Sequence, residues 1–366
     1  MKTVKVICKI CLCWTLFFPF IAGALKESHL SVLYELLKEE EFYTVGSFKG
    51  ANQTLLGYGK FGKGRGKNGS LIFVNGKGES LFRYMELFYD FYLQGWSPIY
   101  TYDHRNQGFS RPVSLPVSFS QSGEIKISNS SKVSYEENYT LYRKDLEAFI
   151  SFILKDRDVD RFNLFLIAHS KGGAVVLDYL QTYPDSPFKS AVLSAPMIKY
   201  NSNLFFFLER GAFFLLNGYC SLMSCQWKTP SFRSRLTYKT FTGSKARYAF
   251  SEFVEKRQFP QSAPKGTSFR WLLESRKITD RLMDQKRIQR IKTPLMFLQA
   301  EKDYFVLNEY QNVFCEKIPD CCRIEKIPGK HEIFMEKDEL RDEALNRVML
   351  FFLSSETYQK QCQQPL

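Results

Sequence analysis

Histidine is rare in this chain of 366 residues, which contains only four, at positions 29, 104, 169 and 331. No zinc-finger spacing and no RNA-binding aromatic signature occurs. Gly57 to Lys63 spells G-x-x-x-x-G-K, but Gly64 follows where a phosphate-binding P-loop needs Ser or Thr for Mg²⁺. These absences count against structural zinc modules, nucleic-acid readers and P-loop nucleotide-binding proteins.

No long block of one charge occurs either, although Lys and Arg outnumber Asp and Glu by 51 to 38, a formal net charge of +13. Such a balance favours anionic partners, and we expect an anionic membrane surface rather than nucleic acid. Hydrophobic residues make up 44% of the chain and 34 residues are Phe, which indicates apolar surface for a lipid. The alternatives are a merely soluble basic protein and a coding bias toward Phe, Lys and Tyr.

The first 24 residues have the pattern of a secretory signal peptide. Lys2 and Lys5 precede a mostly apolar stretch, Ile7 to Ile21, and Ala22-Gly23-Ala24 fits an A-x-A cleavage site. The apolar stretch is short for a membrane-spanning helix. We therefore expect an exported protein that is periplasmic, secreted or membrane-associated, with an uncleaved anchor as the alternative.

Six of the nine cysteines lie beyond this segment, and an even number suits an oxidising compartment. None of these six forms a C-x-x-C pair, which makes a zinc site the weaker interpretation. The spacing allows local disulfides between Cys220 and Cys225, and between Cys315 and either Cys321 or Cys322, without deciding the connectivity.

Short apolar segments alternate with helical patterns, which predicts an α/β fold with a mostly parallel central sheet flanked by helices. Residues 25–196 and 291–366 carry this rhythm and are expected to form the core. Residues 197–290 lack it and include a Phe-rich run at 205–216. We expect this insertion to be a helical cap whose Phe residues line an acyl-chain pocket, face a membrane or pack within the cap.

Local signals predict several element boundaries. Residues 42–61 are expected to form a hairpin, and residues 111–137, rich in Ser and turn formers, a loop. Ser80 is expected to cap a helix that runs to about Gln94.

The strongest chemical signal is Ala-His-Ser-Lys-Gly-Gly at Ala168 to Gly173. It follows an apolar strand pattern, Phe162 to Ile167, and precedes a helical pattern, Lys171 to Thr182. This is nearly the G-x-S-x-G nucleophile elbow, in which a sharp turn exposes a serine hydroxyl at the top of a sheet. Ser170 is therefore the candidate nucleophile for acyl transfer.

A serine nucleophile needs a histidine base and an acid that orients the histidine. His331 lies between the last predicted strand and the closing helix, where active sites of α/β folds form. His169 is adjacent to Ser170 and should point away from it, His104 fits loop architecture, and His29 lies near the N-terminus. We predict His331 as the base.

The acid should come between the serine and the histidine in the chain. Asp303 follows the predicted strand Pro294 to Gln299 and is the candidate, with Glu301, Asp280 and Asp284 as rivals. A solvated loop carboxylate is the alternative role for Asp303.

An oxyanion hole needs backbone N–H donors aimed at the developing charge. We expect one from Lys171, directly after the nucleophile, and one from Lys77 in the loop Asn75 to Ser80. Gly76 and Gly78 would let that loop turn tightly, although alone it is also an ordinary glycine turn.

Together these motifs resemble the α/β-hydrolases, closely the bacterial lysophospholipases of the PldB type and their monoacylglycerol lipase relatives. The resemblance covers roughly residues 40–355, and it rests on Asn75 to Ser80, Tyr102 to Ser110, Ala168 to Gly173 and the contexts of Asp303 and His331. Asn75, Asn106 and Ala168 depart from the family's usual His, Gly and Gly, and none of these touches the three catalytic candidates.

The resemblance implies hydrolysis of the acyl ester of a lysophospholipid through an acyl-enzyme on Ser170, without a metal or an organic cofactor. A monoacylglycerol lipase or carboxylesterase is the alternative within enzymes. A non-catalytic lipid-binding protein with a hydrolase fold is the alternative outside them.

Overall fold

The computed structural model describes residues 24–39, 42–110, 117–119, 125–127, 138–201, 236–258 and 269–362. The expected signal peptide therefore lies outside the described residues apart from its last residue. The Phe-rich run of the cap and the pair Cys220 and Cys225 lie outside them too. Among the described residues, no helix combines the length and the apolar character needed to cross a membrane.

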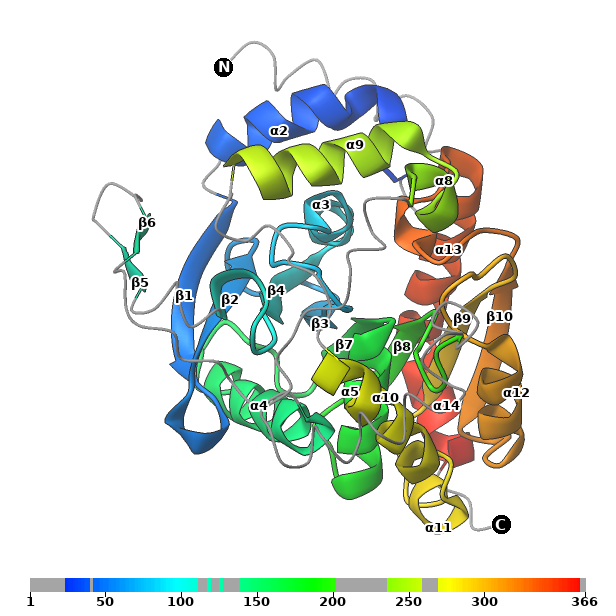
Figure 1. Ribbon diagram of the computed structural model, residues 1–366. Helices are drawn as coiled ribbons and strands as arrows, with labels where there is room; N and C mark the ends of the chain where they lie inside the picture. Colours follow the sequence, from blue (N-terminus) through cyan, green and yellow to red (C-terminus); the bar gives the residue numbers. More distant parts are fainter. Residues whose placement is uncertain are drawn as a thin grey trace.

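The core is one sheet whose eight strands are β1 (Tyr43–Lys49), β2 (Leu55–Phe61), β3 (Gly69–Val74), β4 (Trp96–Tyr102), β7 (Leu164–His169), β8 (Ser190–Ser194), β9 (Leu295–Ala300) and β10 (Cys322–Ile327). Their spatial order is β1-β2-β4-β3-β7-β8-β9-β10 (Figure 1). In this sheet β2 pairs antiparallel with β1 and with β4, and the other pairs are parallel. The predicted fold class is confirmed, and so is the hairpin at residues 42–61.

The central strands are buried on both faces, as parallel strands covered by helices must be. In β7, Leu164, Leu166 and Ala168 pack into one core cluster, whereas Phe165 and Ile167 pack into the other. The alternation follows from the period of two in a strand. It explains why the sequence there is a continuous apolar run rather than an alternating one.

Helices cover both faces of the sheet: α2 (Leu30–Glu39), α3 (Met85–Leu93), α4 (Tyr139–Ile153), α5 (Lys171–Thr182), α8 (Tyr238–Phe241), α9 (Lys245–Phe253), α10 (Phe269–Leu282), α11 (Gln285–Ile288), α12 (Asn308–Glu316), α13 (Asp338–Leu353) and α14 (Ser355–Cys362). Helices α4, α5 and α10 contribute to the first core cluster. Helices α3 and α13 contribute to the second cluster, on the opposite face.

Two predicted boundaries are wrong. Ser80 does not cap α3, which begins at Met85; its backbone N–H and its hydroxyl both donate to Glu255 Oε1, at 3.0 and 2.8 Å. Glu255 lies in a π-helical turn, Val254–Gln258, that is 175 residues away in the chain and invisible to a local capping rule. Within the expected loop 111–137, the described residues form a short hairpin of β5 (Val117–Phe119) and β6 (Ile125–Ile127).

The described part of the expected cap is helical and contains α8, α9, α10 and α11. Figure 1 shows α9 lying beside the N-terminal helix α2, and the ring of Tyr34 meets that of Phe253 edge-on at 5.3 Å. Disulfides join Cys315 to Cys322 and Cys321 to Cys362. The first is one of the two local pairs that the spacing allowed for Cys315.

Candidate active site

Ser170 lies in a sharp turn between β7 and α5. Its φ of 50° and ψ of −115° are outside the regions that a residue with a side chain normally adopts. The turn is held because Ser170 N–H donates to the Ser194 carbonyl and the Ser170 carbonyl accepts from Met197 N–H, at 3.0 and 2.9 Å. A strained strand-to-helix turn of this kind lifts the serine hydroxyl above the sheet.

The two glycines after this turn let α5 approach its neighbours closely. A Cβ on Gly172 would lie 2.2 Å from the Val74 carbonyl oxygen, and one on Gly173 would lie 2.7 Å from Pro196 Cβ. Neither position has room for a side chain. The first turn of α5 therefore packs directly against the end of β3, where the candidate oxyanion loop begins.

The structure brings Ser170, His331 and Asp303 together. His331 Nε2 lies 3.0 Å from Ser170 Oγ, and His331 Nδ1 lies 2.7 Å from Asp303 Oδ2. An ionised carboxylate only accepts hydrogen bonds, so Nδ1 carries a proton and Nε2 faces the serine hydroxyl as an acceptor. Asp303 Oδ1 accepts from the N–H groups of Phe305 and Val306, which fixes the carboxylate.

The rival carboxylates lie elsewhere. Glu301 and Asp280 are exposed, and Asp284 caps α11 by accepting from Arg287 N–H at 3.0 Å. Of the other histidines, His29 is exposed and His104 is buried against the Asn75 carbonyl, with its Nε2 at 2.8 Å.

The two expected oxyanion donors lie on segments that meet at Gly172. Lys171 is the first residue of α5, and the first N–H groups of a helix have no acceptor within it and carry partial positive charge. Lys77 lies in the loop after β3, and the Asn75 carbonyl of this loop would be 2.7 Å from a Cβ on Gly172. Their role as donors stays a prediction.

A buried histidine next to the nucleophile joins the oxyanion loop to the base, which local sequence reasoning missed. His169 Nδ1 lies 2.6 Å from Glu79 Oε1, and His169 Nε2 lies 3.2 Å from the His331 carbonyl oxygen. Glu79 also accepts from Gly76 N–H through its other oxygen. Both nitrogens of His169 therefore face partners other than Ser170.

Glu332, the residue after the candidate base, extends this network. Its Oε2 accepts from the Tyr84 hydroxyl at 2.7 Å, and its Oε1 accepts from the Arg83 guanidinium at 2.8 Å. Arg83 also reaches Glu255 Oε2 at 3.1 Å. The only sequence signal for this role was the position of Glu332 beside His331.

The contacts of His169 fit an imidazolium, because Nδ1 faces the Glu79 carboxylate and Nε2 faces a carbonyl oxygen, and both of these groups accept. Burial would lower the pKa of His169, but the negative charges of Glu79 and Glu332 raise it to about 9. Burial would likewise raise the pKa of Glu332, but the positive charge of Arg83 lowers it to about 2. Both groups are thus charged at neutral pH.

Glu79, His169 and Glu332 also have ligand atoms within 4.8 Å of one another, as a metal site would need. These atoms already contact each other and their neighbours directly. A hydrogen bond joins Glu79 to His169, while Arg83 and Tyr84 donate to the two oxygens of Glu332. The donor set therefore fits a charge network better than a metal site.

A pair of phenyl rings lies beside the candidate base. The Phe305 ring lies 4.9 Å from the His331 ring, and Phe241 stacks on Phe305 with centroids 5.0 Å apart. Phe241 ends α8, which belongs to the expected cap. The cap thus reaches the edge of the site with an apolar surface.

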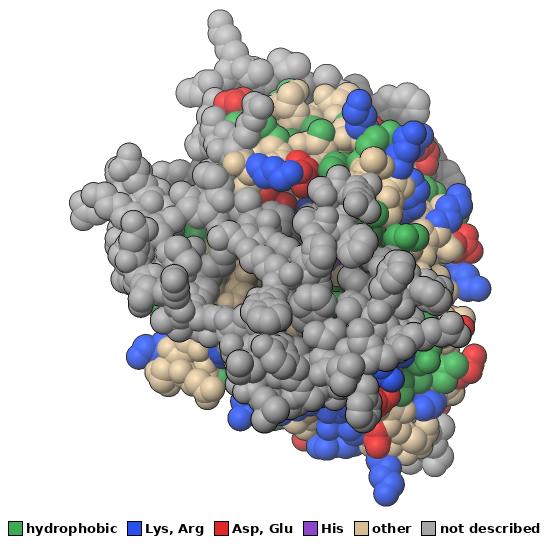
Figure 2. Space-filling view, in the orientation of Figure 1, with side chains coloured by type: hydrophobic (Ala, Val, Ile, Leu, Met, Phe, Trp, Pro, Cys, Tyr) green, Lys and Arg blue, Asp and Glu red, His purple; other side chains and the backbone are tan. Residues whose placement is uncertain are grey.

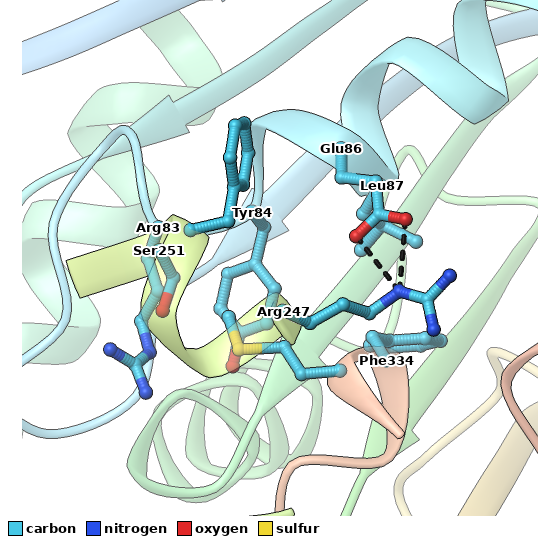
Figure 3. A pocket seen from close by; sticks show the side chains of 9 residues that line it. Arg83, Tyr84, Glu86, Leu87, Arg247, Ser251 and Phe334 are labelled. Atoms are coloured by element: carbon cyan, nitrogen blue, oxygen red, sulfur yellow. Dashed lines mark hydrogen bonds and ion pairs between the residues drawn. The ribbon is translucent and has the colours of Figure 1, made fainter. Parts of the chain in front are cut away.

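Tyr84 also lines a small pocket. The pocket lies between the start of α3, helix α9, and Phe334 and Met335. Figure 3 shows Arg247 in this pocket with its Nε bonded to both carboxylate oxygens of Glu86, at 2.9 and 3.1 Å. The three catalytic candidates do not line it. It is therefore separate from the place where an ester would meet Ser170.

The family model described as serine aminopeptidase S33 (Hydrolase_4) matches residues 66–338. The chain belongs to this family. The family match covers most of both predicted core segments and the whole insertion between them, and it contains Ser170, Asp303 and His331. The resemblance to α/β-hydrolases is confirmed.

Known relatives agree with this family. The chain is 27% identical over 299 residues to "Probable lysophospholipase L2" of Haemophilus influenzae, covering 77% of this chain and 82% of that protein. It is 24% identical over 300 residues to "Lysophospholipase L2" of Escherichia coli K12, covering 77% and 79%. A soluble variant of monoglyceride lipase from Saccharomyces cerevisiae has a similar fold, with a TM-score of 0.63, 18% identity and coverage of 85% and 94%.

Family and geometry agree on the kind of protein. The chain is an α/β-hydrolase of the lipase and esterase type, with the side chains of a serine ester hydrolase at the carboxyl edge of its sheet.

Proposed function

We propose that this protein hydrolyses the acyl ester of lysophospholipids through an acyl-enzyme on Ser170. The single observation that carries the proposal is the pair of contacts of His331, one to Ser170 Oγ at 3.0 Å and one to Asp303 at 2.7 Å. This arrangement activates a hydroxyl as a nucleophile.

In the first half of the reaction, His331 Nε2 takes the Ser170 proton as the oxygen attacks the ester carbonyl. Asp303 stabilises the imidazolium that forms, and the N–H groups of Lys77 and Lys171 bind the oxyanion. When the tetrahedral intermediate collapses, His331 gives its proton to the departing glycerophospho-alcohol and the acyl group remains on Ser170. Water then attacks the acyl-enzyme by the same route and releases a fatty acid.

The choice of lysophospholipid has two supports. The relatives from Haemophilus influenzae and Escherichia coli are named as lysophospholipases, and this chain matches each of them over most of its length. The aromatic edge of Phe241 and Phe305 beside His331 suits an apolar chain better than a peptide. A monoacylglycerol lipase is the second candidate because the yeast monoglyceride lipase shares the fold.

We further propose that the enzyme is exported and works at an anionic membrane surface. The formal net charge of +13 favours such a surface. In Figure 2, blue Lys and Arg side chains extend from the described residues along the lower edge, where Figure 1 draws α10 and α11. Lys277 lies in α10 and Lys292 follows α11, and their side chains are 61% and 58% exposed.

Parallel assays of the purified protein on lysophosphatidylcholine, monoolein and a diacyl phosphatidylcholine test the substrate. We expect release of fatty acid from lysophosphatidylcholine with the highest kcat/KM, and loss of at least about 10³-fold in Ser170→Ala, since the nucleophile is removed. Preference for monoolein would move the assignment to the second candidate. No turnover of any ester, with no labelling by a fluorophosphonate, would favour a lipid-binding protein.

A further inference from the structure

We propose that Gln107 and the side chain of Lys171 together position the oxyanion-binding peptide between Gly76 and Lys77. The inference rests on the proposed function, because it concerns the oxyanion hole of that reaction. Both side chains are positioning groups in this role. They do not touch the oxyanion and affect it only by holding the Gly76–Lys77 peptide unit.

Gln107 lies in the turn after β4 and clamps the oxyanion loop. Its Nε2 donates to the carbonyl oxygens of Gly76 and Glu79, at 3.0 and 3.1 Å. Its Oε1 accepts from Lys171 Nζ at 2.9 Å. The orientation of the amide is fixed by these partners, because two carbonyls need the NH₂ group and an ammonium needs the oxygen.

The clamp on the Gly76 carbonyl sets the direction of the Lys77 N–H. The two groups belong to one trans peptide unit, which is planar, and they point in opposite directions. Rotation of this unit would swing the N–H away from the oxyanion and would also break the bond from Gln107. Gln107 therefore holds the unit in the orientation that the reaction needs.

The peptide unit before it is held as well. His104 Nε2–H donates to the Asn75 carbonyl at 2.8 Å, and Gly76 N–H donates to the Glu79 carboxylate. Burial lowers the pKa of His104 well below its usual range, with the charge of Lys171 adding to this, so the ring is neutral and donates from one nitrogen. The Asn75 carbonyl and the Gly76 N–H, which precede Lys77 in the loop, are therefore both hydrogen-bonded.

The ammonium of Lys171 is an unusual group to bury. The residue is fully buried, with Nζ over the Tyr142 ring at 4.2 Å from its centroid as well as bonded to Gln107. Removing an ammonium from water costs several kcal/mol, which such contacts must offset. Lys171 thus serves both donors: its backbone supplies one N–H, and its side chain orients the amide that holds the other.

Gln107→Glu tests this directly because it keeps the shape of the side chain. One carboxylate oxygen still accepts from Lys171, but the other faces two carbonyl oxygens that it repels. Gln181→Glu is the matched control: Gln181 Nε2 donates to the Leu282 carbonyl at 2.8 Å, and its Oε1 accepts from Arg287 at 3.2 Å. Gln181 is buried like Gln107. It lies near the C-terminal end of α5, the helix that begins at Lys171, roughly 15 Å from the nucleophile turn at 1.5 Å per residue.

We expect Gln107→Glu to lower kcat on p-nitrophenyl butyrate by about 10²-fold, close to the loss of one oxyanion donor, with KM nearly unchanged. The rate of Ser170 labelling by a fluorophosphonate should fall in parallel, while Gln181→Glu keeps both rates. Lys171→Met, which keeps the backbone N–H, should show a smaller fall in kcat with the same unchanged KM. Circular dichroism and thermal unfolding report whether each variant folds.

Wild-type kcat and labelling rate in folded Gln107→Glu would overturn the inference, as would an equal loss in Gln181→Glu. If Gln107→Glu does not fold, an unchanged kcat in Lys171→Met overturns it instead. Both readouts need only a reactive serine. A wild-type protein that cleaves p-nitrophenyl butyrate but not lysophosphatidylcholine refutes the proposed substrate alone, and one that reacts with neither ester nor fluorophosphonate refutes both.

Discussion

At the scale of single residues, the site gives different roles to two histidines, His169 and His331, whose ring centroids are 4.8 Å apart. His331 faces Ser170 with a nitrogen that accepts, whereas His169 donates from both nitrogens and is charged at neutral pH. Their surroundings decide these roles: a carboxylate on one side of His331, and acceptors on both sides of His169. The residue adjacent to the nucleophile is therefore a structural cation and the distant one is the candidate base.

The charge of His169 predicts a pH-dependent stability. Its folded pKa of about 9 lies above the ordinary 6.5, so its contribution is fully present below about pH 6.5 and is lost as pH rises through 9. We expect His169→Gln to lower the free energy of unfolding by about 3 kcal/mol more at pH 6 than at pH 10. Urea denaturation of both proteins at several pH values measures this. A difference independent of pH would contradict the assigned charge.

At the scale of elements, the elbow depends on how closely α5 meets β3. Gly172→Ala would place a Cβ 2.2 Å from a backbone oxygen, Val74 O, which no side-chain rotation can relieve. We expect a loss of about 3 kcal/mol or more in unfolding free energy, together with slower fluorophosphonate labelling, because the first turn of α5 must shift.

Gly64→Ala provides the comparison for this variant. A Cβ there meets no atom within 4 Å, and its cost of about 1 kcal/mol comes from positive φ alone. Equal destabilisation by the two substitutions would mean that close packing at Gly172 is not what holds the elbow.

The sequence was sufficient for elements whose signals are local. The predicted bounds of α5 agree with the structure, because this helix begins and ends with its own periodic pattern. The start of α3 was not predictable in this way, since Ser80 bonds to Glu255 in the cap rather than to its own helix. Chain order and strand ends indicated the placement of Asp303 and His331. Gln107 and Glu332 meet their partners, and Glu79 meets His169, only through the fold.

At the scale of the whole molecule, Arg247 of α9 ties the cap to the core and to the N-terminal segment. This buried guanidinium reaches Glu86 in α3 at 2.9 Å, Asp338 at the start of α13 at 2.6 Å and the Leu25 carbonyl at 2.9 Å. The insertion is therefore attached to the core by ion pairs of Arg247, and to α2 by the contact between the rings of Tyr34 and Phe253. A single residue thus joins segments that are distant in sequence.

We expect Arg247→Met to lower the free energy of unfolding by about 3 to 5 kcal/mol, because it leaves the buried Glu86 carboxylate without this partner. The double variant with Glu86→Leu should recover part of the loss, since the buried charge is then gone. Chemical denaturation at pH 7 compares the three proteins. A double variant less stable than Arg247→Met would show that Arg247 acts through something other than this charge.

In the proposed reaction Ser170 carries the acyl group during turnover. The most direct test quenches the wild-type protein with acid during turnover of lysophosphatidylcholine and analyses its tryptic peptides by mass spectrometry. Trypsin cuts after Arg161 and Lys171, which isolates Ser170 in the peptide 162–171. We expect this peptide to gain the mass of one acyl group, and we expect Ser170→Ala neither to gain it nor to release fatty acid. An acyl group on another residue, or undiminished hydrolysis by Ser170→Ala, would contradict it.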